Sequence, residues 1–258
     1  MAIQGRDPGA GRPLRGVRPI GSPAARPPAR PAPPPRRPPA APARRDPPGP
    51  PLLPLVLIPA VLTLAVTLLR LIGEVRRWDP AYFNRVAGGG LSPLGIAWLV
   101  PFVGFYFGWR LQRAGLRPVS MARAAGWPLL ALGVGWVVAA VAGRVLRTAW
   151  TGHIGIWAVV AVAVATAAFV AWPALGRPLL AYAWAARIPV ALAMALAINR
   201  SWRTHYDAVP PSFPSMPLLK RWVVIGLVPQ MTIWVAWTMV VGAAFGALGW
   251  HAASRRPR

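Results

Sequence analysis

The sequence predicts an all-α, polytopic membrane protein, in which a disordered basic tail precedes a bundle of about six transmembrane helices. Hydrophobic residues make up 55% of the 258 residues. Apolar runs of about twenty residues recur along the chain, and polar connections that contain arginine separate them. At 1.5 Å per residue, twenty helical residues cover roughly 30 Å, the thickness of the hydrocarbon core of a bilayer. Soluble domains do not carry repeated runs of this length.

Residues 1–50 form the predicted tail, with ten arginines, sixteen prolines and no aromatic residue. Such a segment cannot bury enough apolar surface to offset the entropy lost on ordering. Three possibilities remain for the partner of this tail: no partner, anionic lipid head groups that attract a polybasic segment, or a docking domain. Nucleic acid is not favoured, because arginine is abundant throughout the chain and a GC-rich genome produces the same bias.

The remaining chain divides into a transmembrane domain, 51–250, and a short basic carboxyl-terminal tail, 251–258. Ser92 and Pro93 predict an N-cap and a first helical residue for the second segment. Gly176 and Arg177 alone separate the fourth and fifth segments, so a tight hairpin is expected. The last segment is longer than a bilayer requires and should tilt, kink or protrude. The six segments are about 52–72, 91–109, 124–143, 154–175, 178–198 and 222–250.

Basic residues predict the orientation, because cytoplasmic connections carry an excess of arginine and lysine. With a cytoplasmic amino terminus, the inner regions hold 18 basic residues and the outer loops hold 9. The expected location is therefore a bacterial-type inner membrane, crossed several times, with both termini in the cytoplasm.

The fifth segment carries Arg187 near its middle, with Pro189 two residues later. A lone guanidinium at that depth costs at least about 2.5–3.5 kcal/mol on insertion scales, so it should face protein or a water-filled cavity. No other segment offers a carboxylate at the same depth. Two interpretations remain: carbonyls freed by prolines and the side chain of Gln230 satisfy Arg187, or its donors bind a lipid phosphate or a carboxylated solute.

Gln230 and Thr232 lie beside Pro229, which removes a helical hydrogen bond in the last segment. Broken helices with polar groups form ligand sites in many transporters, although they also occur in plain bundles. Arg187, Gln230 and Thr232 are therefore the candidate ligand-binding residues.

The loop 199–221 is the richest polar stretch outside the tail. His205 and Asp207 could orient one another, and Arg200 or Arg203 could bind an anion. No recognised nucleophile motif accompanies these residues, so no catalytic residue is assigned and an enzyme is not the favoured class.

Two acidic residues follow the first segment among arginines, and we expect Glu74 and Asp79 to form a solvated cluster with Arg76 and Arg77. Glycines at four-residue spacing, such as Gly104 and Gly108, are typical of close helix contacts within a chain. The chain has no cysteine and three histidines far apart in sequence. We therefore expect no metal and no cofactor.

The favoured function from the sequence is a non-catalytic structural or accessory membrane component. One alternative is a small transporter or channel that uses Arg187 and the proline-kinked helices. The other is a membrane enzyme that acts on lipid through the 199–221 loop.

Overall fold

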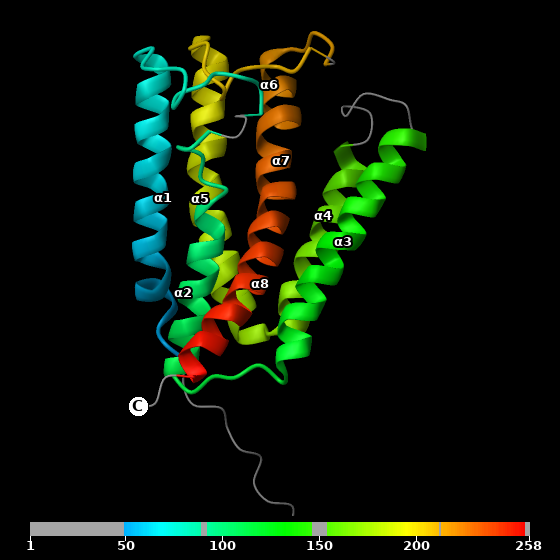
Figure 1. The fold of residues 1–258 in the computed structure, drawn as a ribbon. Helices are drawn as coiled ribbons and strands as arrows, with labels where there is room; N and C mark the ends of the chain where they lie inside the picture. Colours follow the sequence, from blue (N-terminus) through cyan, green and yellow to red (C-terminus); the bar gives the residue numbers. More distant parts are fainter. Residues whose placement is uncertain (1–48, 89–91, 146–153, 212, 256–258) are drawn as a thin grey trace, which may run out of the picture. The chain divides into compact units, whose positions relative to one another are not determined.

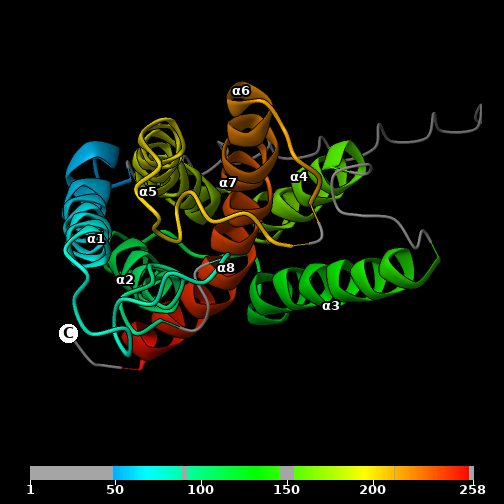
Figure 2. The same ribbon diagram turned by 90° about the horizontal axis from the view of Figure 1, so that it is seen from above.

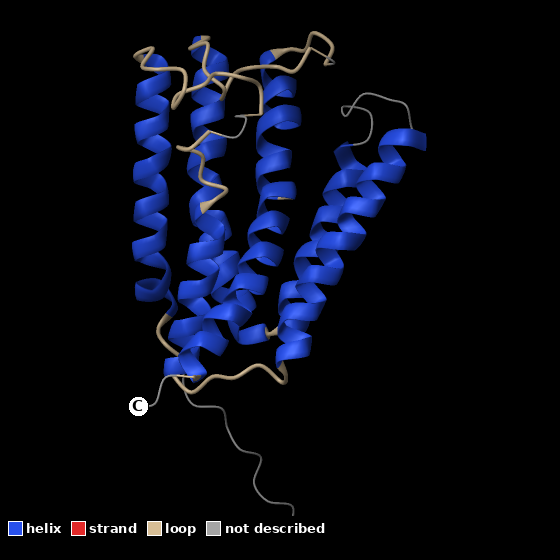
Figure 3. Cartoon of the chain, viewed as in Figure 1, coloured by secondary structure: helices blue, strands red, loops and turns tan. Residues whose placement is uncertain are grey.

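The structure, a computed structural model, describes residues 49–88, 92–145, 154–211 and 213–255. These residues form helices joined by turns and irregular loops, without a strand among them (Figures 1 and 3). The all-α class predicted from the sequence is confirmed for this part of the chain. The predicted tail, 1–50, lies outside the described residues apart from Gly49 and Pro50, and so do 256–258 of the carboxyl-terminal tail.

The helices follow one another with short connections, except for two longer loops. We call these the α1–α2 loop, described over 76–88 and 92–98, and the α5–α6 loop, described over 201–211 and 213–217. The elements are α1 (Leu52–Val75), α2 (Leu99–Arg113), α3 (Met121–Val145), α4 (Ile154–Ala171), α5 (Pro173–Arg200), α6 (Leu218–Arg221), the π-helix η2 (Trp222–Leu227), α7 (Val228–Met231) and α8 (Ile233–Ser254).

Among the described residues, five helices are long and apolar enough to cross a membrane: α1, α3, α4, α5 and the composite helix Leu218–Ser254. This number is compatible with a multi-pass membrane protein. The remaining predicted segment, the second at about 91–109, corresponds to α2, which has 15 residues and is therefore shorter than a span.

Helices α5 and α8 lie at the centre of the packing. The apolar window of α5 is 50% buried, the largest share among the five candidate spans. Helix α8 contacts α2, α3, α4 and α5. Helices α3 and α4 run side by side as a pair and pack on α8 (Figures 1 and 2). The interior is thus organised around α5 and α8.

Glycines allow the backbones of α2 and α8 to touch. A Cβ atom on Gly104 would collide with the backbone of Gly242, and one on Gly108 would collide with the backbone of Gly246. The predicted helix-contact glycines are therefore confirmed as contacts within the chain. Close approach of this kind supplies van der Waals contact where lipid provides no hydrophobic driving force between helices.

We expect Gly108→Ala to lower the apparent melting temperature in detergent, because the new methyl group meets backbone that cannot move without separating α2 from α8. Overpacking of this kind costs about 1–3 kcal/mol. Gly133→Ala in α3 is the matched control, since a Cβ there meets no heavy atom within 4 Å. Thermal unfolding that is equally affected, or equally unaffected, in the two variants would contradict the importance of this contact.

Two predicted helix starts were wrong. The helix expected from residue 91 begins at Leu99, because Ser92 and Pro93 form a turn: Ser92 Oγ accepts from Leu94 N at 3.3 Å and Gly95 N donates to Ser92 O at 2.9 Å. The break between α4 and α5 falls at Trp172, whose backbone is extended, and not at residues 176–177. Pro173 causes this shift, since proline disfavours the helical conformation in the preceding residue and suits the first helical position.

The composite helix is irregular where Pro229 was expected to disturb it. The π-helix η2 precedes the proline, and the backbone is broken again at Thr232, whose φ is −119°. Pi-helical turns widen the hydrogen-bond spacing and are frequent at functional sites. The irregular stretch faces α5, so it provides a wall for the cavity described next.

Candidate functional site

A partly open cavity of about 220 Å³ lies between α1, α5 and the irregular part of the composite helix, beneath the two long loops. We call it the Arg187 cavity. Both loops lie at the end of the bundle where α1 and α5 end and α6 begins (Figure 1). Its polar lining residues are Thr67, Arg70, Arg187, His205, Tyr206 and Gln230, and its larger apolar ones include Leu94, Val190, Met194, Phe213, Ile225 and Trp234.

The cavity reaches the interior of the bundle because one wall is irregular backbone. Residues 94–97 of the α1–α2 loop line it, and this loop returns between the helices before α2 begins (Figure 3). Trp98 Nε1 donates to Pro93 O at 2.7 Å and holds the turn. At membrane depth, non-helical backbone is tolerated only where protein buries it or where it lines a water-filled cavity. Residues 94–97, near the end of the α1–α2 loop, therefore form part of the cavity wall.

Arg187 is the most deeply placed charge in the cavity. It lies thirteen residues before the end of α5, which corresponds to roughly 20 Å along a helix. The side chain is 4% exposed, and its guanidinium carbon stands 4.8 Å from the ring centroid of Trp234. Among the described residues no hydrogen-bond acceptor or carboxylate engages the guanidinium, and Nε is buried without a partner. The ring face of Trp234 stabilises the cation but accepts none of its in-plane N–H donors.

Gln230 shares the cavity with Arg187 but does not bind it. Its Nε2 approaches Met194 Sδ at 3.8 Å, and its Oε1 is buried without a partner. Thr232 is not among the lining residues, and its hydroxyl donates to Val228 O at 2.7 Å. Of the three predicted ligand-binding residues, Arg187 and Gln230 thus line the same cavity and Thr232 does not.

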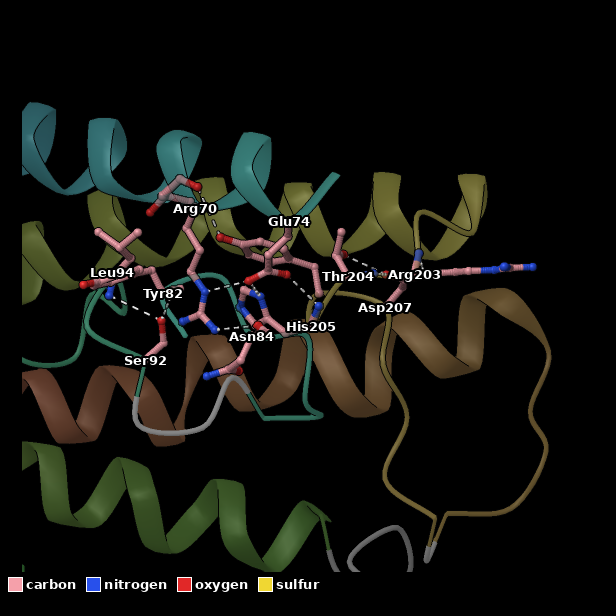
Figure 4. A network of polar contacts seen from close by, with 12 residues as sticks. Arg70, Glu74, Tyr82, Asn84, Ser92, Leu94, Arg203, Thr204, His205 and Asp207 are labelled. Atoms are coloured by element: carbon pink, nitrogen blue, oxygen red, sulfur yellow. Dashed lines mark hydrogen bonds and ion pairs between the residues drawn. The ribbon is translucent and has the colours of Figure 1, made fainter. Parts of the chain in front are cut away.

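A buried carboxylate at the end of α1 organises the loop side of the cavity (Figure 4). Glu74 is 0% exposed and accepts from Arg70 Nε at 2.8 Å. It also accepts from His205 N at 2.8 Å, and His205 Nδ1 lies 2.6 Å from its Oε1. The expectation that Glu74 is solvated beside Arg76 and Arg77 was wrong, because Arg70 and His205 bury it instead.

Arg70, Glu74 and Tyr206 were not assigned to a site from the sequence. One signal was available for the first two. Four polar residues recur at four- and three-residue intervals in the apolar first segment, a spacing that places them on one face of a helix. All four are buried: Thr63, Thr67, Arg70 and Glu74. A polar stripe on a membrane helix indicates a face turned towards protein.

The α5–α6 loop is held by its own aspartate. Asp207 accepts from Arg203 N at 2.8 Å, from Thr204 N at 2.6 Å and from the Thr204 hydroxyl at 2.7 Å. These bonds stabilise a turn in which Ser201 and Arg203 adopt positive φ angles of 51° and 55°. Asp207 thus accepts hydrogen bonds from Arg203 and Thr204 within the loop, and His205 is hydrogen-bonded to Glu74 and not to Asp207. Arg200 is exposed, as is Arg203, and neither lines the cavity.

His205 lines the cavity, and in its neutral form one of its ring nitrogens carries a lone pair. The Glu74 carboxylate already accepts two other N–H groups, so the neutral imidazole carries its proton on Nδ1 and donates it to Glu74. In the described part of the chain, Nε2 has no hydrogen-bond partner. Burial lowers the pKa of His205 and the positive charge of Arg70 acts in the same direction, whereas Glu74 and Asp207 oppose them. Burial also raises the pKa of the neighbouring Tyr206 hydroxyl, which donates to Thr67 O at 3.3 Å.

Comparisons with protein families, with curated proteins and with solved structures find no match for this chain. The chemistry of the cavity therefore rests on its own geometry. Arg187, His205 and Gln230 border a space of about 220 Å³, and among the described residues Arg187 Nε and Gln230 Oε1 have no hydrogen-bond partner. Such a site suits a small anionic group.

We expect Glu74→Gln to destabilise the protein. The N–H groups of the new amide would face the N–H groups of Arg70 and His205, and Arg70 would lose the carboxylate of Glu74. Removing one partner of a buried ion pair costs about 3–5 kcal/mol. Asp79→Asn is the control, since Asp79 is exposed and an amide oxygen can still accept from Ala81 N. Equal melting temperatures in detergent for Glu74→Gln and the wild type would show that Glu74 does not hold this region.

Proposed function

We propose that this protein is a multi-pass membrane protein that binds an anionic group in the Arg187 cavity, with Arg187 as the main ligand. The anion is either a small solute on a transport path or the head group of a lipid. One observation carries the proposal: Arg187, a residue that is 4% exposed, lines a cavity, and its guanidinium has no acceptor among the described residues.

The energetics of Arg187 support a ligand. The guanidinium cannot lose its proton in a protein, so its donors need acceptors. A liquid water occupies about 30 Å³, so 220 Å³ has room for roughly seven waters or for one sulfate-sized anion with a few of them. Typical pockets for drug-sized ligands start at about 300 Å³, which favours a head group or a small anion over a larger ligand.

The non-catalytic structural role remains the second candidate, and the close glycine packing of α2 on α8 favours it. Under that role, trapped water alone satisfies Arg187. An enzyme with a protein nucleophile has less support. The two hydroxyls that line the cavity are engaged, because Thr67 donates to Thr63 O and Tyr206 donates to Thr67 O.

The test compares melting temperatures of the full-length protein in detergent with and without inorganic phosphate. We expect phosphate to stabilise the wild type and Arg200→Leu, a variant that removes an exposed arginine from the same helix. A ligand at one hundred times its Kd adds about 2.7 kcal/mol. Phosphate should not stabilise Arg187→Leu, and Arg187→Lys should respond weakly because an ammonium lacks the planar fork.

A parallel arm with short-chain phosphatidic acid distinguishes the two sources of the anion. Stabilisation by the lipid alone assigns a lipid head group, whereas stabilisation by inorganic phosphate assigns a soluble anion. Equal stabilisation of the wild type and Arg187→Leu by both ligands would overturn the proposal. Without ligand, Arg187→Leu should melt at the same or a higher temperature, since it removes a buried charge that makes no hydrogen bond to any described residue.

We also propose that the protein lies in a bacterial-type inner membrane with both termini in the cytoplasm. The excess of basic residues on that side supports this orientation, and it places the tail 1–50 beside the anionic cytoplasmic leaflet. The amino end of α1 and the carboxyl end of α8 lie at the same end of the bundle (Figure 1), as the proposal requires.

Because the chain has no cysteine, single cysteines report the orientation directly. A membrane-impermeant maleimide applied to intact cells should label Ser215→Cys, in the α5–α6 loop, and not Ser254→Cys, at the end of α8. Both positions are exposed. Labelling of Ser254→Cys alone would reverse the orientation.

A further inference from the structure

His205 is a second ionisable residue that lines the Arg187 cavity. Its ring is held in an orientation that leaves one nitrogen able to bind a proton. Its backbone N–H and its Nδ1 both face the Glu74 carboxylate, at 2.8 Å and 2.6 Å. This arrangement fixes the orientation of the ring and leaves Nε2 without a hydrogen-bond partner in the described residues. The imidazole lines the same cavity as Arg187.

We propose that the cavity binds a doubly charged anion together with a proton, which His205 takes up on Nε2. The ligand class is thus a divalent oxyanion, such as sulfate or a phosphate monoester, and the second ligand is the proton. This inference rests on the proposed function, because it requires that the anion binds beside Arg187.

The charges around the cavity explain the stoichiometry. Arg70 and Glu74 form an ion pair at 2.8 Å, so they cancel each other to a first approximation. Arg187 then supplies one uncompensated positive charge. A monovalent anion neutralises it, whereas a divalent anion leaves one negative charge in a poorly hydrated space, which is unfavourable. A proton on Nε2 of His205 removes that excess and adds a charge-assisted hydrogen-bond donor.

The groups that face His205 come from each neighbouring element. Helix α1 provides Glu74 and Arg70, the α5–α6 loop provides Asp207 and Tyr206, and α5 provides Arg187 across the cavity. The lining residues of the α1–α2 loop and of the composite helix are not titratable; they are Gly88, Leu94, Gly95, Ile96, Ala97, Val224, Ile225, Pro229, Gln230 and Trp234.

The direction of the pH dependence follows from these groups. Burial lowers the pKa of His205 below its ordinary value of 6.5, so the ring is neutral at pH 7 in the free protein. A bound anion opposes this effect and raises the pKa. Affinity should therefore increase as the pH falls through the pKa of the anion-bound state, and it should level off below the lower pKa of the free state.

The experiment measures sulfate binding to the full-length protein in detergent by calorimetry, between about pH 5 and pH 8, the range in which histidine titrates. Sulfate keeps its charge over this range, so any slope belongs to the protein. We expect the affinity of the wild type to rise by up to about tenfold per pH unit, the limit for one coupled proton. The monovalent methanesulfonate should show a smaller slope.

His205→Asn keeps an N–H donor for Glu74 but cannot bind a proton, so its sulfate affinity should not depend on pH. His251→Asn, a substitution near the end of α8 away from the cavity lining, should retain the slope of the wild type. If His205→Asn does not fold, the number of protons that the wild type takes up on binding each anion tests the coupling instead. Calorimetry in buffers of different ionisation enthalpy should give more protons per sulfate than per methanesulfonate.

The outcomes separate the two proposals. A sulfate affinity that is flat with pH in the wild type, or a slope that survives in His205→Asn, overturns the proton coupling and leaves the anion site standing. Sulfate binding that is absent, or equal in the wild type and Arg187→Leu, overturns the anion site and the coupling with it. Because the wild type and Arg187→Leu carry the same arginine-rich tail, the comparison of these two proteins also cancels any sulfate binding by the tail.

Discussion

A permanent positive charge inside an apolar bundle is the constraint to which the rest of the site responds. Arg187 lies on the most buried of the candidate spans and cannot neutralise itself. Among the described residues the guanidinium has no hydrogen-bond acceptor; it borders a cavity, with the ring of Trp234 against one side. Irregular backbone in the α1–α2 loop and in the composite helix forms the cavity walls, and regular helices would fill this space.

A second buried charge attaches the loops to this cavity. Glu74 joins α1 to the α5–α6 loop, through contacts with His205 that connect residues 131 positions apart. The inner face of α1 continues the polar contacts into the bundle, where the hydroxyls of Thr63 and Tyr182 lie 2.8 Å apart. Polar groups thus extend from the loops along α1 to Tyr182 in α5.

The sequence predicted the all-α class and the buried position of Arg187. Both depend on local properties: the length of the apolar runs and the presence of a charge inside one of them. The sequence was not sufficient for the partner of His205, because nothing local indicates that Glu74 and not Asp207 receives its hydrogen bond. Predicted helix starts were wrong where one sequence signal is compatible with two local structures. Ser92 and Pro93 suit an N-cap and equally suit a turn, and the hydrogen bond from the Ser92 hydroxyl to Tyr82 O, within the folded loop, accompanies the turn.

The most direct test of the anion site is a crystal structure of the protein soaked in selenate, a divalent oxyanion that scatters anomalously. The account predicts an anomalous difference peak in the Arg187 cavity, within hydrogen-bond distance of the guanidinium. A cavity without such a peak, in which Arg187 instead donates to protein carbonyls or to Gln230, would contradict it.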